Sequence, residues 1–65
     1  MVGQRIKNYL IENGIKQTFL SEKSDIPNSI LAAMLSGKRK IEVMEYVRIC
    51  QALKVDMRTF LDEVG

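Results

Sequence analysis

The segment 17–40 constrains the fold of this chain most, because its residue order predicts two short helices joined by a tight turn. The first helix is predicted over Gln17–Lys23 and is interrupted at Ser24-Asp25. The second is predicted over Asn28–Ser36, directly after Pro27, a residue tolerated where a helix starts. Two short helices separated by a turn of a few residues form a helix-turn-helix unit.

Apolar residues at helical spacing and the residues that follow support this interpretation. Gly37 is expected to end the second helix, since glycine readily adopts the left-handed conformation found there. The basic run Lys38, Arg39 and Lys40 comes next, as expected of a unit that lays its second helix in a DNA major groove. The predicted inner faces are Phe19, Leu20 and Ser21 in the first helix and Ile30, Leu31, Met34 and Leu35 in the second.

Three more helices complete a predicted all-α, five-helix domain over residues 1–65. They are expected at Val2–Asn13, ended by Gly14, at Glu42–Leu53, and at Met57–Glu63, with Asp56 as N-cap. No segment alternates with the period of a strand. The helix at 42–53 is apolar over much of its circumference, which predicts a well-covered central helix. The methionines and the pair Phe19 and Phe60 are interpreted as core fillers.

Composition limits the classes of function. Sixty-five residues allow one small domain that buries about 60% of its unfolded surface. There is no apolar run of about 18 residues and no secretory signal, so neither a membrane nor export is expected, and the predicted location is the cytoplasm. One cysteine and no histidine exclude a disulfide framework and the usual zinc spacings. Cys50 is predicted to be a packed thiol, with redox sensing as the alternative.

Nothing in the sequence predicts catalysis, a metal site, a cofactor or a small-molecule ligand. The chain has no histidine base, no glycine-rich phosphate loop and no carboxylate pair on a face likely to line a cleft. Glu42 and Glu45 are three residues apart, but acids near a helix N-terminus usually interact with the helix dipole. An enzyme is therefore not expected.

The distribution of charge favours nucleic acid more than its total does. The formal net charge is only +2, yet the stretch from Ile26 to Ile41 has three basic residues and no acidic one. Such a surface is typical of a small DNA-binding protein. A solvated loop that merely carries three charges is the alternative.

Taken together, these elements resemble the Cro/C1-type (XRE) helix-turn-helix repressor family over nearly the whole chain. The matching pieces are VGQRIKNYLIENGIKQ, FLSEKSDIPNSIL, GKRK and VRICQALKVDMRTFL. The resemblance implies a transcription regulator that binds double-stranded DNA at a palindromic operator as a homodimer, of the kind common in phages, prophages and mobile elements.

The resemblance also implies roles for individual residues. Gln17, at the start of the first helix of the unit, would hold a phosphate, joined by Lys16 and by Lys38, Arg39 and Lys40. On the second helix, Asn28 would pair with adenine, Ser29 with several bases, and Ala32 and Ala33 with thymine methyl groups.

The chain departs from the family pattern at several positions. Lys16 and Pro27 replace Ser or Thr helix caps, and Asp25 replaces the glycine of the turn. Leu10 and Leu35 stand where the family often has an Arg–Glu ion pair. Because two apolar side chains can replace a buried pair at no cost, we expect Leu10 and Leu35 to touch and brace the second helix.

Dimerisation is expected because one 65-residue reader contacts a single half-site. The predicted surface is formed by the end of the chain. The alternative is that these residues close the core of the protomer, which is favoured for Phe60 and Leu61. The residues assigned to the dimer surface are Met57, Phe60, Leu61 and Val64, near Lys54 and Val55.

A protein-interaction module on the same scaffold, such as an antirepressor or a partner subunit, is the competing hypothesis. It rests on the scarcity of hydrogen-bonding groups on the second helix, where Ala32, Ala33 and Leu35 would offer apolar surface. DNA binding should weaken steeply with salt, whereas an apolar protein complex should barely respond.

Overall fold

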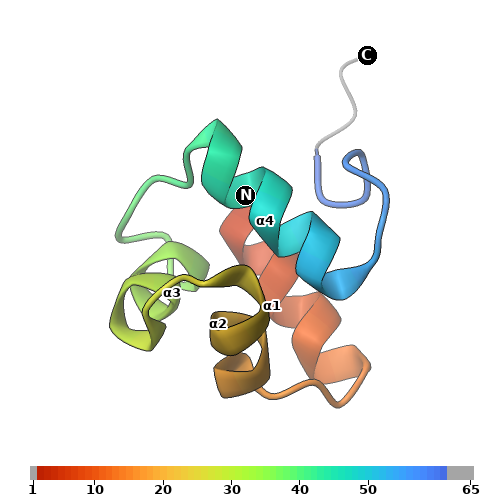
Figure 1. Ribbon diagram of the computed structural model, residues 1–65, viewed down its shortest axis with the longest axis horizontal. Coiled ribbons are helices and arrows are strands. Elements are labelled where there is room, and N and C mark those ends of the chain that lie inside the picture. Colours follow the sequence, from red (N-terminus) through yellow and green to blue (C-terminus); the bar gives the residue numbers. More distant parts are fainter. Residues whose placement is uncertain (1, 62–65) are drawn as a thin grey trace.

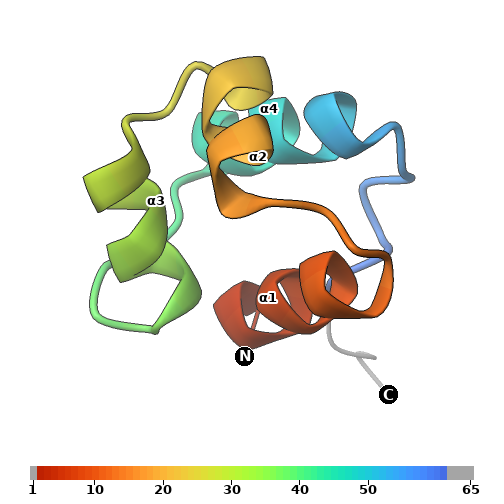
Figure 2. The same ribbon diagram turned by 90° about the horizontal axis from the view of Figure 1, so that it is seen from below.

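The computed structural model describes residues 2–61, in which four α-helices and no strand are present. Helix α2 packs on both α3 and α4, and α1 packs on α3 (Figure 1). Seen from below, α1 lies across the core from α2 and α4, and α3 closes one end (Figure 2). The predicted all-α class is confirmed. The helices are α1 (Val2–Glu12), α2 (Gln17–Ser24), α3 (Asn28–Leu35) and α4 (Val43–Leu53).

One apolar cluster holds the helices together, and every helix contributes to it. Of the residues predicted to face inward from α3, Leu31, Met34 and Leu35 are buried and Ile30 is half-buried. Ile6 on α1 has no exposed surface. Burial of such side chains contributes roughly 1.5–3 kcal/mol each. Cys50 is buried among them as a free thiol, as predicted. The buried members are Ile6, Leu10, Leu20, Ile26, Leu31, Met34, Leu35, Tyr46, Ile49, Cys50 and Phe60.

The prediction of a fifth helix over Met57–Glu63 is wrong for the described residues, because residues 57–61 form turns. The hydroxyl of Tyr46 donates to the Met57 carbonyl, the group that would accept from Leu61 N–H in an α-helix. Leu61 N–H donates instead to the Arg58 carbonyl at 3.2 Å. Asp56 caps locally, since its carboxylate accepts Arg58 N–H at 2.8 Å. Residues 62 and 63 lie outside the described residues.

The prediction of a well-covered fourth helix is wrong for its first turn. Tyr46, Ile49 and Cys50 form the buried stripe of α4, whereas Val43 and Met44 in its first turn are 76% and 67% exposed. The apolar side chains of this first turn therefore reach solvent.

Aromatic and methionine side chains divide between core and surface. Phe60 is buried and meets Tyr9 edge to face, with ring centroids 5.4 Å apart. Met34 is buried too. Phe19 is 44% exposed and Met57 40% exposed, so their interpretation as core fillers is wrong.

Left-handed residues end the helices where the sequence predicted. Gly14 has φ 63° after α1, and Gly37 has φ 84° after α3. Asp25 has φ 59° and caps α2, which confirms that aspartate can replace glycine in the turn. Lys54 adopts the same conformation after α4, with φ 57°.

Gly3 allows the start of α1 to approach the end of α3 closely. A Cβ atom at this position would lie 2.3 Å from the carbonyl oxygen of Met34. No side chain can rotate to relieve that overlap, because the opposing atom belongs to the backbone. The two helices must therefore separate before any larger residue fits.

We expect Gly3→Ala to lower the free energy of unfolding by about 1–3 kcal/mol, because overpacking outweighs the helix propensity gained by alanine. Urea denaturation followed by circular dichroism measures the change. Lys7→Ala, on the exposed face of α1, is the control. A stabilised Gly3→Ala variant would show that the helices separate at no cost.

Leu10 and Leu35 are 4% and 2% exposed and belong to the same cluster, as the predicted contact between them requires. We expect Leu35→Glu to lower the free energy of unfolding by about 3 kcal/mol or more, because it buries a carboxylate with no partner. Leu35→Met, which keeps volume and polarity, should cost less than about 1.5 kcal/mol. Equal thermal melting of both variants would show that Leu35 is not enclosed.

Candidate nucleic-acid interface

The turn between α2 and α3 is fixed by hydrogen bonds from two small side chains. Ser24 Oγ donates to the Leu20 carbonyl at 2.6 Å, inside the core. Ser21 Oγ donates to the Ile26 carbonyl at 2.6 Å, and Ile26 N–H donates to the Ser21 carbonyl at 3.2 Å. Ile26 itself is buried. These contacts, with the left-handed Asp25, set the direction in which α3 leaves α2.

The predicted base-reading residues lie together on the outer face of α3. Asn28, Ser29 and Ala32 are exposed and Ala33 is half-buried. Asn28 and Ala32 are four residues apart, as are Ser29 and Ala33, and Ser29 and Ala32 are three apart. Residues at these spacings are neighbours on a helix surface, so the four form one surface. The opposite face of α3 is buried, and Leu35 belongs to it. Leu35 is therefore unavailable for the apolar docking that the competing hypothesis assigned to it.

A hydrogen bond joins Gln17 on α2 to Asn28 on α3. Gln17 Nε2 donates to Asn28 Oδ1 at 3.1 Å. The residue predicted to hold a phosphate thus contacts a residue predicted to read a base. Because the Asn28 oxygen is an acceptor here, its amide NH₂ remains as a donor for a further partner.

Neither helix of the unit has a side-chain cap at its N-terminus. Lys16 precedes α2 and Pro27 precedes α3, and neither makes a capping hydrogen bond, as their replacement of Ser or Thr predicted. A helix N-terminus carries partial positive charge and attracts phosphate. Lys16 is exposed beside the start of α2, and its positive charge adds to the partial positive charge of that helix N-terminus.

The basic run is attached to the end of α3. Lys38 and Arg39 N–H groups donate to the Ala33 carbonyl at 2.9 and 3.1 Å. The side chains of Lys38 and Lys40 are exposed, without an ion pair among residues 2–61. Three cations therefore project from a loop with a defined position relative to α3.

Arg39 differs from its two neighbours because it has an acidic partner. Its Nη2 lies 3.3 Å from Glu45 Oε2, on the first full turn of α4. The other oxygen of Glu45 accepts Glu42 N–H at 2.9 Å, completing a capping box at the start of α4. The stretch 26–41 around Arg39 contains no acid in the sequence, but in the fold Glu45 on the next helix supplies one.

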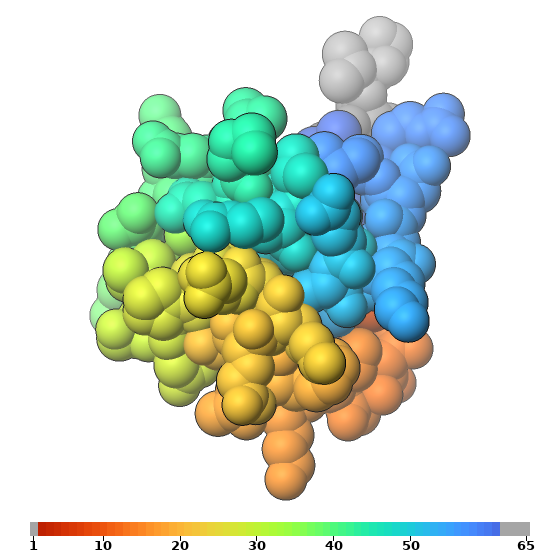
Figure 3. All heavy atoms as spheres, viewed as in Figure 1, coloured from red at the N-terminus to blue at the C-terminus, as the bar shows by residue number. Residues whose placement is uncertain are grey.

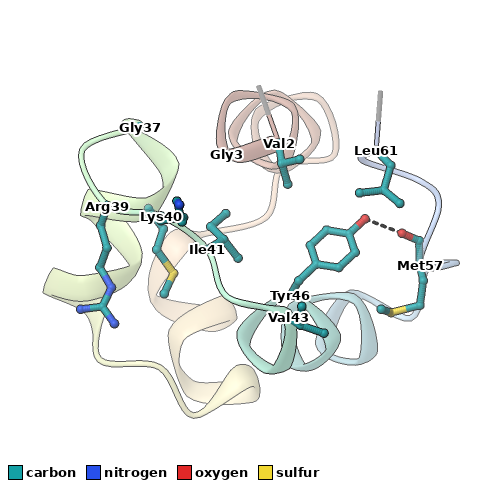
Figure 4. A pocket seen from close by; sticks show the side chains of 11 residues that line it. Val2, Gly3, Gly37, Arg39, Lys40, Ile41, Val43, Tyr46, Met57 and Leu61 are labelled. Carbon is teal, nitrogen blue, oxygen red and sulfur yellow. Dashed lines mark hydrogen bonds between the residues drawn. The ribbon is translucent and has the colours of Figure 1, made fainter. Parts of the chain in front are cut away.

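An apolar groove of about 760 Å³ lies beside the basic run, between the start of α1, the loop 37–42, the start of α4 and the turns at 57–61. Figure 4 shows Ile41 and Tyr46 in its middle, with Met57 and Leu61 on one side. Arg5 Nη1 donates to the Leu61 carbonyl at 3.2 Å and helps to hold that side in place.

Of the residues predicted to form the dimer surface, some are exposed in the structure and one is buried. Met57 and Leu61 are 40% and 46% exposed, so Leu61 does not belong to the core as the alternative held. Phe60 is 2% exposed and cannot reach a second molecule, because Tyr9 and the core enclose it. Val64 lies outside the described residues. Val43 was not assigned to this surface, although it lines the groove with Met57 and Leu61, and Met44 next to it in the chain is exposed as well.

The ionisable groups in the core do not form a reactive centre. Burial raises the pKa of the Cys50 thiol, which keeps it protonated and poorly nucleophilic. Burial also raises the pKa of Tyr46, whose hydroxyl donates to the Met57 carbonyl. Residues 2–61 contain no group of three or more acids or cysteines that could hold a metal ion. None of the helices in that range is long and apolar enough to cross a membrane.

Two eight-residue helices, a fixed turn and an exposed outer face on the second helix define a helix-turn-helix unit. The sequence model of the helix-turn-helix family matches residues 6–60, which is most of the chain. The chain therefore belongs to the Cro/C1-type helix-turn-helix family of DNA-binding regulators, and the predicted resemblance is confirmed. No curated protein and no solved structure matches it.

Proposed function

We propose that the protein is a cytoplasmic, sequence-specific transcription repressor that binds a palindromic operator as a homodimer. The observation that supports this most is the joint exposure of Asn28, Ser29 and Ala32 on α3, next to a basic loop with a defined position. A helix held in this way can enter the major groove while its neighbours contact the backbone.

The proposed roles follow from the chemistry of each group. The Asn28 amide donates to a base edge, while its oxygen stays on Gln17 unless adenine displaces it. Ser29 hydrogen-bonds a base, and Ala32 and Ala33 contact thymine methyl groups. Phosphates are held by the start of α2, with Lys16, and by the basic loop. Phosphate contacts set position, and base contacts set sequence.

Selection from a random duplex DNA pool, followed by a salt titration, tests the proposal. Enrichment of a palindrome with a steep loss of affinity as salt rises is the expected result. Weak binding without enrichment, equal on all duplexes, would contradict sequence-specific reading.

The three cations of the loop should contribute unequally. Lys38→Gln and Lys40→Gln should each lower the slope of log affinity against log salt by about one. Arg39→Gln should lower it by less, because Glu45 already neutralises part of its charge. Lys54→Gln, at the far end of α4, is the control. Equal slopes for Arg39→Gln and Lys38→Gln would show that DNA separates Arg39 from Glu45.

The homodimer is proposed to form through Val43, Met57 and Leu61, which line the groove and are exposed, and through exposed Met44, which follows Val43 in the first turn of α4. A self-complementary patch of this kind suits a two-fold interface. Its position beside the end of α3 would bring the two recognition helices onto the same side of the dimer.

Met44→Glu should leave a folded monomer that binds a palindromic duplex at least about tenfold more weakly, because a charge enters an apolar interface. Analytical ultracentrifugation and fluorescence anisotropy measure the two effects. Ile11→Glu is a closely matched control, since Ile11 is 68% exposed and Met44 67% exposed. A Met44→Glu variant that still sediments as a dimer would move the interface elsewhere.

A further inference from the structure

A second hollow of about 620 Å³ lies between α2 and the C-terminal half of α4. It includes no residue of α3 or of the basic loop. Figure 3 shows the face of the molecule on which α2 lies next to the end of α4. Its main side chains are Phe19 and Lys23 from α2, Arg48 and Ala52 from α4, and Lys54 after it.

Positive charge dominates this α2–α4 cleft. Lys23, Arg48 and Lys54 line it together with a single acid, Asp25. Within residues 2–61, no ion pair involves any of the three cations. Three cations against one acid leave the lining with a net positive charge, and an anionic partner relieves the repulsion among the cations.

An exposed aromatic ring accompanies the charge. Phe19 is 44% exposed, and Lys23 Nζ lies 5.7 Å from its ring centroid. Half-buried Ala52 adds apolar surface nearby. A large apolar or aromatic side chain of a ligand can therefore pack on Phe19 while carboxylates meet the cations.

Asp25 favours a peptide over a nucleic acid as the occupant. A carboxylate in the lining repels phosphates and peptide carboxylates alike, but it can accept N–H groups, which a peptide backbone has and a sugar-phosphate backbone lacks. We infer that the α2–α4 cleft docks an acidic segment of a partner protein, anchored by one aromatic or large apolar side chain on Phe19. Since α3 takes no part, the segment can bind while α3 reads DNA.

A titration of ¹⁵N-labelled protein with a synthetic peptide tests this inference without any DNA. The probe is a short chain of aspartates and glutamates around one phenylalanine. Amide signals of Lys23, Arg48, Ala52 and Lys54 are expected to shift, less so at higher salt. Arg48→Glu should weaken binding about tenfold, because it reverses a charge inside the cleft. Lys7→Glu, with the same charge change on α1, should weaken it far less.

The apolar anchor is tested separately. Phe19→Ser should weaken peptide binding, whereas Ile11→Ser, at another exposed apolar position, should leave it unchanged. A peptide with serine in place of its phenylalanine should also bind the unaltered protein more weakly.

Three results would overturn the inference. Shifts confined to residues 28–40 would mean that the peptide only imitates DNA at the reading face. Equal losses from Arg48→Glu and Lys7→Glu would mean that net charge alone attracts it. Tighter binding of a single-stranded oligonucleotide than of the peptide in the α2–α4 cleft would make nucleic acid the occupant. None of these depends on whether an operator is found.

Discussion

The close approach of α1 to the last turn of α3 at Gly3 governs the arrangement of everything that follows α3. Because the Met34 carbonyl oxygen lies 2.3 Å from where a Cβ of residue 3 would be, the backbones of α1 and α3 can approach this closely only with glycine at residue 3. The basic loop is attached to the same turn of α3, because the N–H groups of Lys38 and Arg39 donate to the Ala33 carbonyl. The outer face of α3, with the proposed base-reading residues, and the neighbouring cations are therefore fixed relative to the core. Recognition of a rigid duplex favours such preorganisation.

The sequence was enough to predict what local chemistry decides. Helix ends at Gly14 and Gly37 follow from the need for a left-handed residue, and Asp25 fills the same need in the turn. The orientation of α3 follows from its apolar spacing, which buries one face and leaves Asn28, Ser29 and Ala32 outside. That these residues read bases was inferred from the resemblance to the family, and it stays a prediction.

What the sequence could not predict depends on contacts between distant residues. The turns at 57–61 place the Met57 carbonyl against the hydroxyl of Tyr46, a residue on α4, and nothing near residue 57 indicates this contact. Phe19 and Met44 have helical spacing suited to burial, but no neighbouring helix covers them. The partner of Arg39 likewise comes from α4, where Glu45 had been interpreted as a dipole partner alone.

Arg39 connects the two surfaces on which the proposed function depends. It belongs to the basic loop and lines the apolar groove, and its salt bridge reaches the turn of α4 that carries Val43 and Met44. The reading face has few donors, so a single half-site can discriminate only modestly between sequences. In the proposed dimer, much of the specificity must then come from the fixed spacing of two half-sites and from DNA shape. The Arg39–Glu45 salt bridge fixes the basic loop relative to the first turn of α4. It would thereby fix the proposed phosphate contacts relative to the two-fold axis of the proposed dimer, and so the spacing of the two half-sites.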